Sequence, residues 1–168
     1  MRHSLYTLVF LCLFVGATSA NAEVVALQNV KIDIPAGWTA VPSASPRSMR
    51  LRGPGGKIEI TVVVHNHGAS SDADIEQLAK RLSEAETQAF ARTARESGLS
   101  VSHQTANVGK EASRWQLQSS RGLSNGIELR GITTLEPGRA ISIGAESKSV
   151  GQPELDSAVR LIASRVGA

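Results

Sequence analysis

The chain has 168 residues and a formal net charge of +3, and its composition excludes several classes of function. Its only cysteine, Cys12, lies within the first 22 residues, which excludes thiol catalysis, disulfides, iron–sulfur clusters and cysteine zinc sites for the remainder. Beyond residue 22 the only aromatic side chains are Trp38, Phe90 and Trp115, too few for a stacking platform for sugars or bases. The small net charge also argues against a nucleic-acid partner.

Residues 1–22 have the pattern of an export signal. A basic start at Arg2 is followed by an apolar run over residues 5–15 and by the A-x-A cleavage signature that ends at Ala22. The run is too short to cross a bilayer, which needs about 20 apolar residues. We therefore expect cleavage between Ala22 and Glu23, and a periplasmic or secreted protein with no membrane span after processing.

Residues 23–168 are expected to form a single domain, and its first part has the two-residue period of β-strands. One strand is predicted over Val24–Ile34 and a short one over Met49–Gly53. A turn at residues 53–56 leads into the strongest strand, Lys57–His65, whose isoleucines and valines share one face.

A long amphipathic helix is predicted next. Residues 70–74 offer several N-caps, and Asp74 with Gln77 has the spacing of a capping box. Apolar residues then recur at helical spacing from Ile75 to Phe90, and Gly98 is the expected left-handed stop.

After Gly98 the two-residue period returns and predicts an antiparallel meander. Its turns are expected at Gly109, at Asn125-Gly126 and at Pro137-Gly138. The four predicted strands are Leu99–Val108, Lys110–Ser119, Gly126–Leu135 and Arg139–Lys148. A last helix is expected to open at Pro153 and to end at Gly167.

This order of elements predicts the α+β class, with a mainly antiparallel sheet of six to seven strands packed against two long helices. The apolar stripes of both helices must be buried against the sheet. One sheet face is expected to be wetter, because Gln116 and Gln118 alternate with Trp115 and Leu117.

Two histidines give the most specific hint of a ligand. His65 and His67 are two residues apart, so on a strand both imidazoles would point the same way and could hold one metal ion. A metal site needs three or four ligands, and Asp72, Asp74 and His103 are the nearest candidates. The alternative interpretation is that these are polar residues where a strand runs out into a loop.

A basic cluster surrounds the predicted hairpin. Arg47, Arg50, Arg52 and Lys57 could meet an anionic partner, such as a phospholipid head group or an acidic protein surface. The alternative is that they guard an edge strand against sheet-to-sheet aggregation.

Motifs for catalysis and for cofactors are missing from the sequence. Gly53–Lys57 resembles a phosphate loop, but Ile58 stands where Ser or Thr is needed and a strand follows instead of a helix. No Gly-x-Ser-x-Gly elbow occurs. We therefore expect no cofactor and no enzymatic activity, although spacing cannot exclude a hydrolase whose residues are scattered along the chain.

The segment Val30–Trp38, with its P-x-G-W turn, resembles the opening of the PsbP/DcrB-like (Mog/PsbP) superfamily. The order of hairpin, long helix, antiparallel meander and closing helix is also similar. The resemblance implies a sheet with helices on both faces. It also implies a non-enzymatic binding, assembly or chaperone-like role, with no catalytic residues to assign.

The expected function is therefore an exported, non-enzymatic binding or adaptor protein of the cell envelope that acts through an envelope or secreted protein partner. Two alternatives remain open. One is a periplasmic protein that binds a small ligand or a metal through His65 and His67, and the other is an immunity-type inhibitor of a secreted toxin.

Overall fold

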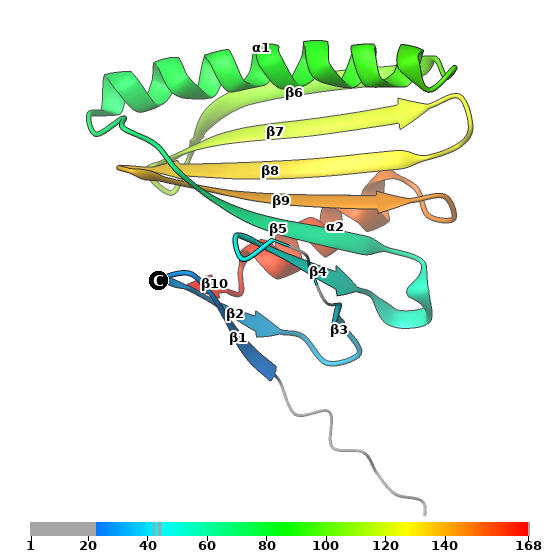
Figure 1. Cartoon of the computed structure of the whole chain (residues 1–168), viewed down its shortest axis with the longest axis horizontal. Helices are drawn as coiled ribbons and strands as arrows, with labels where there is room; N and C mark the ends of the chain where they lie inside the picture. Colours follow the sequence, from blue (N-terminus) through cyan, green and yellow to red (C-terminus); the bar gives the residue numbers. More distant parts are fainter. Residues whose placement is uncertain (1–22, 42, 44, 168) are drawn as a thin grey trace, which may run out of the picture.

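The computed structural model describes residues 23–41, 43 and 45–167, so the predicted export signal lies outside the described residues. Two helices and ten strands follow one another in an α+β arrangement (Figure 1). The helices are α1 (Asp72–Glu96) and α2 (Gln152–Ala163), with a 3-10 turn, η1 (Pro54–Gly56). The strands are β1 (Glu23–Leu27), β2 (Val30–Ile34), β3 (Thr39–Val41), β4 (Ser48–Arg52), β5 (Glu59–Asn66), β6 (Val101–Glu111), β7 (Arg114–Leu123), β8 (Glu128–Glu136), β9 (Arg139–Ser147) and β10 (Val166–Gly167).

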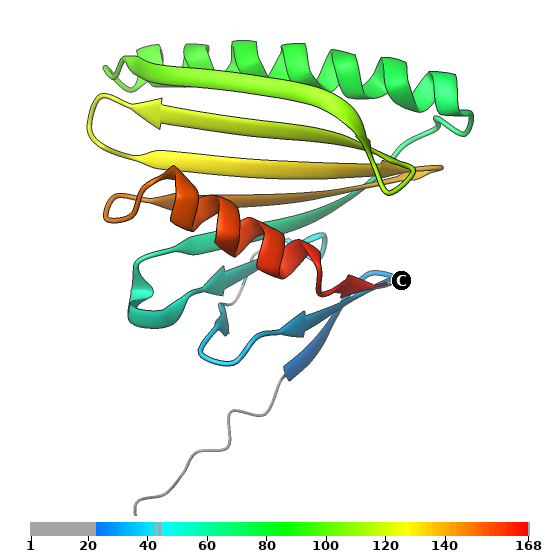
Figure 2. The ribbon, with the colours of Figure 1, turned by 180° about the vertical axis from the view of Figure 1, so that it is seen from behind.

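The main sheet has seven strands in the order β3-β4-β5-β9-β8-β7-β6, and every neighbouring pair is antiparallel. The predicted class and strand number are therefore confirmed. A second sheet, β1-β2-β10, joins the first two strands of the described chain to its last strand beside α2 (Figures 1 and 2). The pairing of β5 with β9 is the long-range step, because it joins the N-terminal hairpin to the end of the meander.

The two helices lie on opposite faces of the main sheet, as the views from the two sides show (Figures 1 and 2). Helix α1 packs on β6, β7 and one end of β8, whereas α2 packs on β8, β9 and β2. The α2 side holds the larger core, in which Leu155, Val159 and Ile162 are 0% exposed against the strands. On the α1 side a smaller cluster joins Ile75 and Ala79 to the far ends of β8 and β9.

The ends of α1 follow from its capping residues. The Ser71 hydroxyl accepts a hydrogen bond from the Asp74 amide at 3.2 Å, and Gly98 adopts a left-handed conformation at the other end. The helix therefore begins at Asp72, earlier than the predicted Asp74 and Gln77 capping box implies.

Several predicted boundaries differ from those in the structure. The predicted strand Val24–Ile34 is split by a tight turn at Gln28, which has a φ of 54°. Gly109 stays extended inside β6, and the turn falls at Ala112 and Ser113. Both residues have positive φ values, which are uncommon outside glycine, so the sequence pattern did not predict this turn. Of the two long helices expected, α2 has 12 residues against 25 in α1, and the chain beyond it forms β10 on the second sheet.

Candidate functional site

The strands β4, β5 and β9 are closed on one face and open on the other. On the α2 side Ile60, Val62 and Val64 are at most 1% exposed, because α2 and the second sheet cover them. On the α1 side Thr61, Gly144 and Glu146 are exposed, because α1 lies mainly over β6 and β7, whereas Ala140 at the other end of β9 is buried. We call the α1-side surface of β4, β5, β9 and β8 the open face.

A trench of small residues crosses this open face at right angles to the strands. Ser119 of β7 pairs with Gly131 of β8, Gly131 with Gly144 of β9, and Gly144 with Thr61 of β5. Neighbouring strands are spaced by about 4.8 Å, so this row is roughly 14 Å long. The trench forms a cavity of about 300 Å³, and Arg50 of β4 extends the row at its outer end.

The floor of the trench carries hydroxyl groups. Ser119 is 6% exposed, and a β-carbon placed on Gly131 would lie 2.8 Å from its Oγ, so this hydroxyl occupies the space above the glycine. Thr133 donates to the Ser142 hydroxyl at 2.9 Å beside it. The Ser119 hydroxyl is not among the buried side-chain atoms that lack a hydrogen-bond partner in the described residues.

The wall of the trench on the helix side is built by Arg121. Its guanidinium donates to Glu86 of α1 at 2.8 Å and lies 5.3 Å from the centre of the Phe90 ring. The Arg121 side chain is 14% exposed and ties the middle of α1 to β7. One end of this guanidinium is therefore engaged within the fold, whereas its buried Nε has no hydrogen-bond partner among the described residues.

Two carboxylates lie directly opposite each other at the other side of the trench, where Glu59 pairs in register with Glu146. Arg50 donates to Glu59 at 2.5 Å and Arg52 at 3.1 Å, and these two hydrogen bonds, in that order, lower the pKa of Glu59. No ion pair in the described part of the chain includes Glu146. Glu146 therefore makes no ion pair there, although Lys57 and Lys148 line the same hollow.

Two glycines and a serine of the trench were missed in the sequence, although a signal was present. Antiparallel strands pair symmetrically about their turns, so the turns after β7 and after β8 place Ser119, Gly131 and Gly144 side by side. Thr61 carries no such signal, because β5 and β9 are far apart in the chain.

The structure resembles solved structures of other proteins. The solution structure of cyanobacterial PsbP (CyanoP) from Synechocystis sp. PCC 6803 matches with a TM-score of 0.61 at 14% identity, over 91% of this chain and 95% of that one. The chain has a PsbP-like fold. A crystal structure from Bacteroides thetaiotaomicron VPI-5482 matches with a TM-score of 0.43 at 10% identity, over 83% of this chain and 44% of that one. No family model and no curated protein matches the chain.

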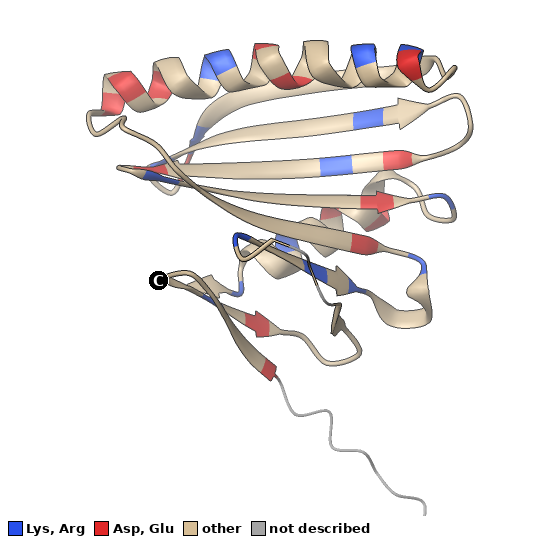
Figure 3. Ribbon diagram, in the orientation of Figure 1, with Lys and Arg blue, Asp and Glu red and all other residues tan. Residues whose placement is uncertain are grey.

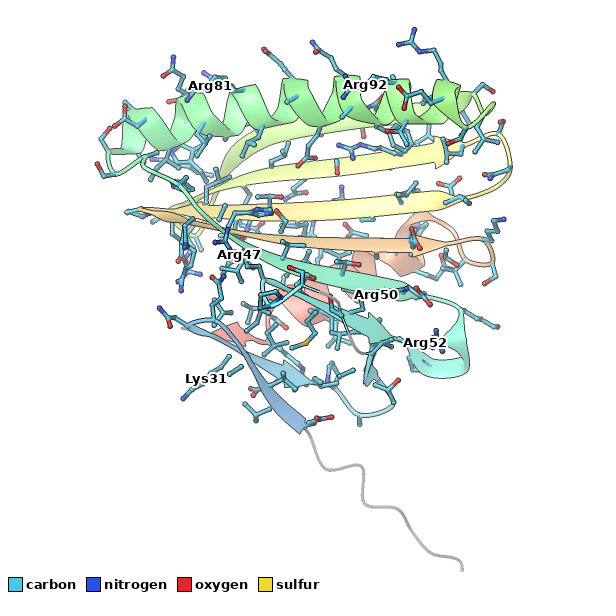
Figure 4. All side chains as sticks on the ribbon, in the orientation of Figure 1. Lys31, Arg47, Arg50, Arg52, Arg81 and Arg92 are labelled. Carbon is cyan, nitrogen blue, oxygen red and sulfur yellow. The ribbon has the colours of Figure 1, made fainter. Side chains whose placement is uncertain are left out.

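Within the PsbP-like fold, the predicted basic cluster is only partly brought together. Arg50 and Arg52 lie near one end of β4 and share Glu59, whereas Arg47 precedes the strand at its other end (Figure 4). Lys57 lies near Glu59 and Glu146, so charges of both signs meet at this end of the sheet (Figure 3). The sequence pattern missed Glu59 as the counter-charge, and binding of an anionic partner stays a prediction.

The two histidines do not share a strand face. His65 is exposed in β5, which ends at Asn66, and His67 lies beyond the strand. The Nδ1 atom of His67 accepts a hydrogen bond from the Ala69 amide at 3.2 Å, so in the neutral ring the proton sits on Nε2, where it blocks a metal.

The other suggested ligands do not complete a metal site. His103 pairs with Gly122 at the opposite end of the sheet from His65, which pairs with Ala140. No group of three or more His, Cys, Asp or Glu side chains in the described ranges could hold a metal ion. Metal binding by His65 and His67 stays a prediction that this geometry disfavours.

His103 lies instead in a polar cluster at the start of α2. Its Nε2 is 3.4 Å from the Glu128 carboxylate and 3.4 Å from the Ser120 hydroxyl. The Gln152 amide donates to Glu128 at 2.6 Å and to two main-chain carbonyls of β7 and β8. A β-carbon on Gly122 would lie 2.4 Å from the imidazole, so the absence of a side chain there lets His103 reach across β7. The cluster fastens the helix to the sheet.

Both tryptophans hold the fold together. The Trp115 indole donates to Asp72 at 3.1 Å and the Lys110 ammonium lies 5.0 Å from the ring centre, which joins β6 and β7 to the first turn of α1. The Lys110 and Trp115 hydrogen bonds hold the pKa of Asp72 low against a smaller effect of burial, with Lys110 contributing most. Trp38 packs against the larger core and against Gly53.

Proposed function

We propose that this protein is an exported, non-enzymatic binding protein that holds a partner protein of the cell envelope against its open face. The observation that supports the proposal is the one-sided coverage of β4, β5 and β9. Antiparallel sheets often keep one solvated face, and on this one the exposed side chains, including Thr61, Arg50 and Glu146, are available for contact with a partner.

The polar clusters favour binding over catalysis. The serine, histidine and glutamate groups that meet around His103 contact each other at 3.4 Å, and Gln152 ties the glutamate to the main chain. A nucleophile needs a base at closer range, oriented by a third group. The PsbP-like fold does not decide between binding and catalysis, because one fold hosts many functions.

The proposed location in the periplasm depends on the sequence of residues 1–22. Among the helices of the described residues none is long and apolar enough to cross a membrane. Expression with the leader in a Gram-negative host tests the location. Mass spectrometry of the periplasmic fraction should give a chain that begins at Glu23, and full-length protein in the cytosol or membrane would contradict the proposal.

Photo-crosslinking tests the docking surface. Thr61 is exposed on the open face and Thr105 is exposed on β6 away from it, so a crosslinking residue can replace either. In the native envelope we expect one discrete adduct from position 61 and none from position 105. Equal labelling from both positions, or none from position 61, would contradict docking on the open face.

A matched pair of glycine variants sharpens this test. Gly144 lies in the trench and Gly109 lies on β6, both are exposed, and a β-carbon on either meets nothing within 4 Å. Gly144→Trp should fill the trench and remove the adduct at position 61, whereas Gly109→Trp should leave it unchanged. Both variants should remain folded, because a side chain replaces glycine in a strand without strain.

A further inference from the structure

The main sheet has two edges, and they differ in length. At one edge lies β3, with three residues, and at the other lies β6, with 11 residues. In the described part of the chain β6 pairs only with β7, so the main-chain groups along its outer side have no strand to bond to. An extended main chain is the ligand that matches such a row of N–H and C=O groups.

The features that usually protect an edge strand are missing from most of β6. No proline, Asp, Glu, Lys or Arg occurs over residues 101–109 (Figure 3). Lys110 follows, but its ammonium donates to Asp72 of α1 at 2.8 Å and so lies on a face of the sheet rather than along its edge. The β-bulge, which also discourages pairing, lies at the start of the strand between Val101 and His103. Most of the edge is therefore open to pairing with another strand.

The order of side chains along β6 is complementary to itself in an antiparallel pair. Past the bulge the register is regular from His103 to Glu111, and the middle of this stretch is Asn107. Two such strands paired about Asn107 place Glu111 of one copy opposite His103 of the other. Lys110 then lies opposite Gln104 of the other copy. A carboxylate thus meets an imidazole, and no two like charges are opposed.

The side chains that are opposed in this way belong to the same face of the sheet. Side chains of α2 lie 3.4 Å from His103 and 3.9 Å from Glu111. Gln104 and Lys110 both bond to α1, on the other face. The twofold axis of such a pair is perpendicular to the sheet, so it keeps α1 of both copies on one face and α2 of both copies on the other.

We infer that two copies of this chain associate through the outer edges of β6, so that their seven-stranded sheets join into one antiparallel sheet. This inference goes beyond the proposed function, because β6 is not part of the open face. The opposed side chains are small or polar, so the association should be weak, with a Kd of about 100 µM. At the far lower concentration of the crosslinking experiment the chain stays monomeric, and no adduct from position 105 is still expected.

Analytical ultracentrifugation of the purified protein tests the association. Between about 5 µM and 500 µM the average mass should rise from that of one chain toward that of two. Asn107 would face Asn107 of the second copy, so Asn107→Lys alone and Asn107→Glu alone should each weaken the association about five-fold or more. An equal mixture of the two variants should restore it. Asn29→Lys, exposed in the turn between β1 and β2, should leave it unchanged.

Disulfide formation tests the register. Because Cys12 is the only cysteine, a single cysteine in a Cys12→Ser background reports on one position. At about 500 µM, Asn107→Cys should give a covalent dimer on oxidation, since opposed α-carbons are about 4.5–5.5 Å apart. Thr105→Cys is equally exposed, but its two α-carbons would be roughly 14 Å apart, too far for a disulfide.

The outcomes decide the inference in either direction. It is supported by a rise in mass that Asn107→Lys weakens and that the mixture with Asn107→Glu restores. A chain that stays monomeric at about 500 µM would overturn it, as would association of Asn107→Lys at the strength of the parent, which would place the contact on another surface. Equal covalent dimers from positions 105 and 107 would also contradict the pairing.

Discussion

The contact between α2 and the sheet through Asp156 gives a prediction whose size can be worked out. The Asp156 carboxylate accepts hydrogen bonds from Arg130 of β8 at 2.7 Å and from Arg160 of α2 at 2.8 Å. The Arg130 side chain is 13% exposed and that of Asp156 is 33% exposed. The perturbation is Asp156→Asn, which keeps the shape and removes the charge.

The expected loss of stability comes mainly from Arg130. A hydrogen bond to a charged group contributes about 1.5–3 kcal/mol when shielded from water, and an exposed helical ion pair such as the one with Arg160 about 0.3–0.5 kcal/mol. Because a third of the aspartate is exposed, we take the lower part of the range. Asp156→Asn should therefore lower the free energy of unfolding by about 2 kcal/mol at pH 7.

The effect should depend on pH. Burial raises the pKa of Asp156, but the hydrogen bonds from Arg160 and Arg130 together outweigh it and leave the pKa below the ordinary value of 3.8. A lowered pKa in the folded state stabilises the fold above the unfolded-state pKa, and this contribution disappears as the pH falls through the folded-state value. The difference between the parent and Asp156→Asn should thus shrink between about pH 5 and pH 2.

Urea unfolding at a series of pH values measures both quantities. Asp33→Asn is the control, because Asp33 is exposed on β2 and no ion pair among the described residues includes it, so its effect should stay within about 0.5 kcal/mol. A loss for Asp156→Asn that is as large at pH 2 as at pH 7 would show that the charge is not responsible.

Three further predictions concern the core, the trench and the histidines. Leu155→Ala, at a 0% exposed position, should lower the free energy of unfolding by about 2–5 kcal/mol in a denaturant titration. Leu161→Ala, at a 37% exposed position on the same helix, should lower it far less, and equal losses would refute the assigned burial. Gly144→Val should leave the thermal midpoint unchanged or raise it, and a drop would mean that the space above Gly144 is filled. Calorimetric titration with zinc should give no saturable heat, because Nδ1 of His67 already accepts a hydrogen bond from the Ala69 amide. Saturable heat that disappears in the His65→Ala, His67→Ala double variant would contradict this prediction.

Much of the architecture was predictable because local chemistry specifies it. The periodicity of the strand at Glu59–Asn66 and of the helix that ends before Gly98 appears in consecutive residues. The errors in the predicted boundaries lie at turns whose residues are not typical turn formers. Ala112 and Ser113 form a tight turn without glycine, and Gly109 lies in an ordinary strand.

The candidate site was less predictable than the fold. The sequence drew attention to residue types with strong chemistry, namely the histidines and the arginines. The structure places His65 and His67 on different segments and neutralises part of the arginine cluster with Glu59. The trench is built from glycine, serine and threonine, which attract no notice singly because each is common in turns and on strand faces.

The sequence by itself determined the elements, their antiparallel succession and the small residues aligned across the meander, because periodicity and turns act over a few residues. Only the tertiary structure decided that β5 pairs with β9, which adds Thr61 to the trench, and that the two helices cover different strands on opposite faces. These features depend on burying both helical stripes at once. The simultaneous burial of both apolar stripes depends on the whole chain and not on any single segment. This packing leaves one face of β4, β5 and β9 open.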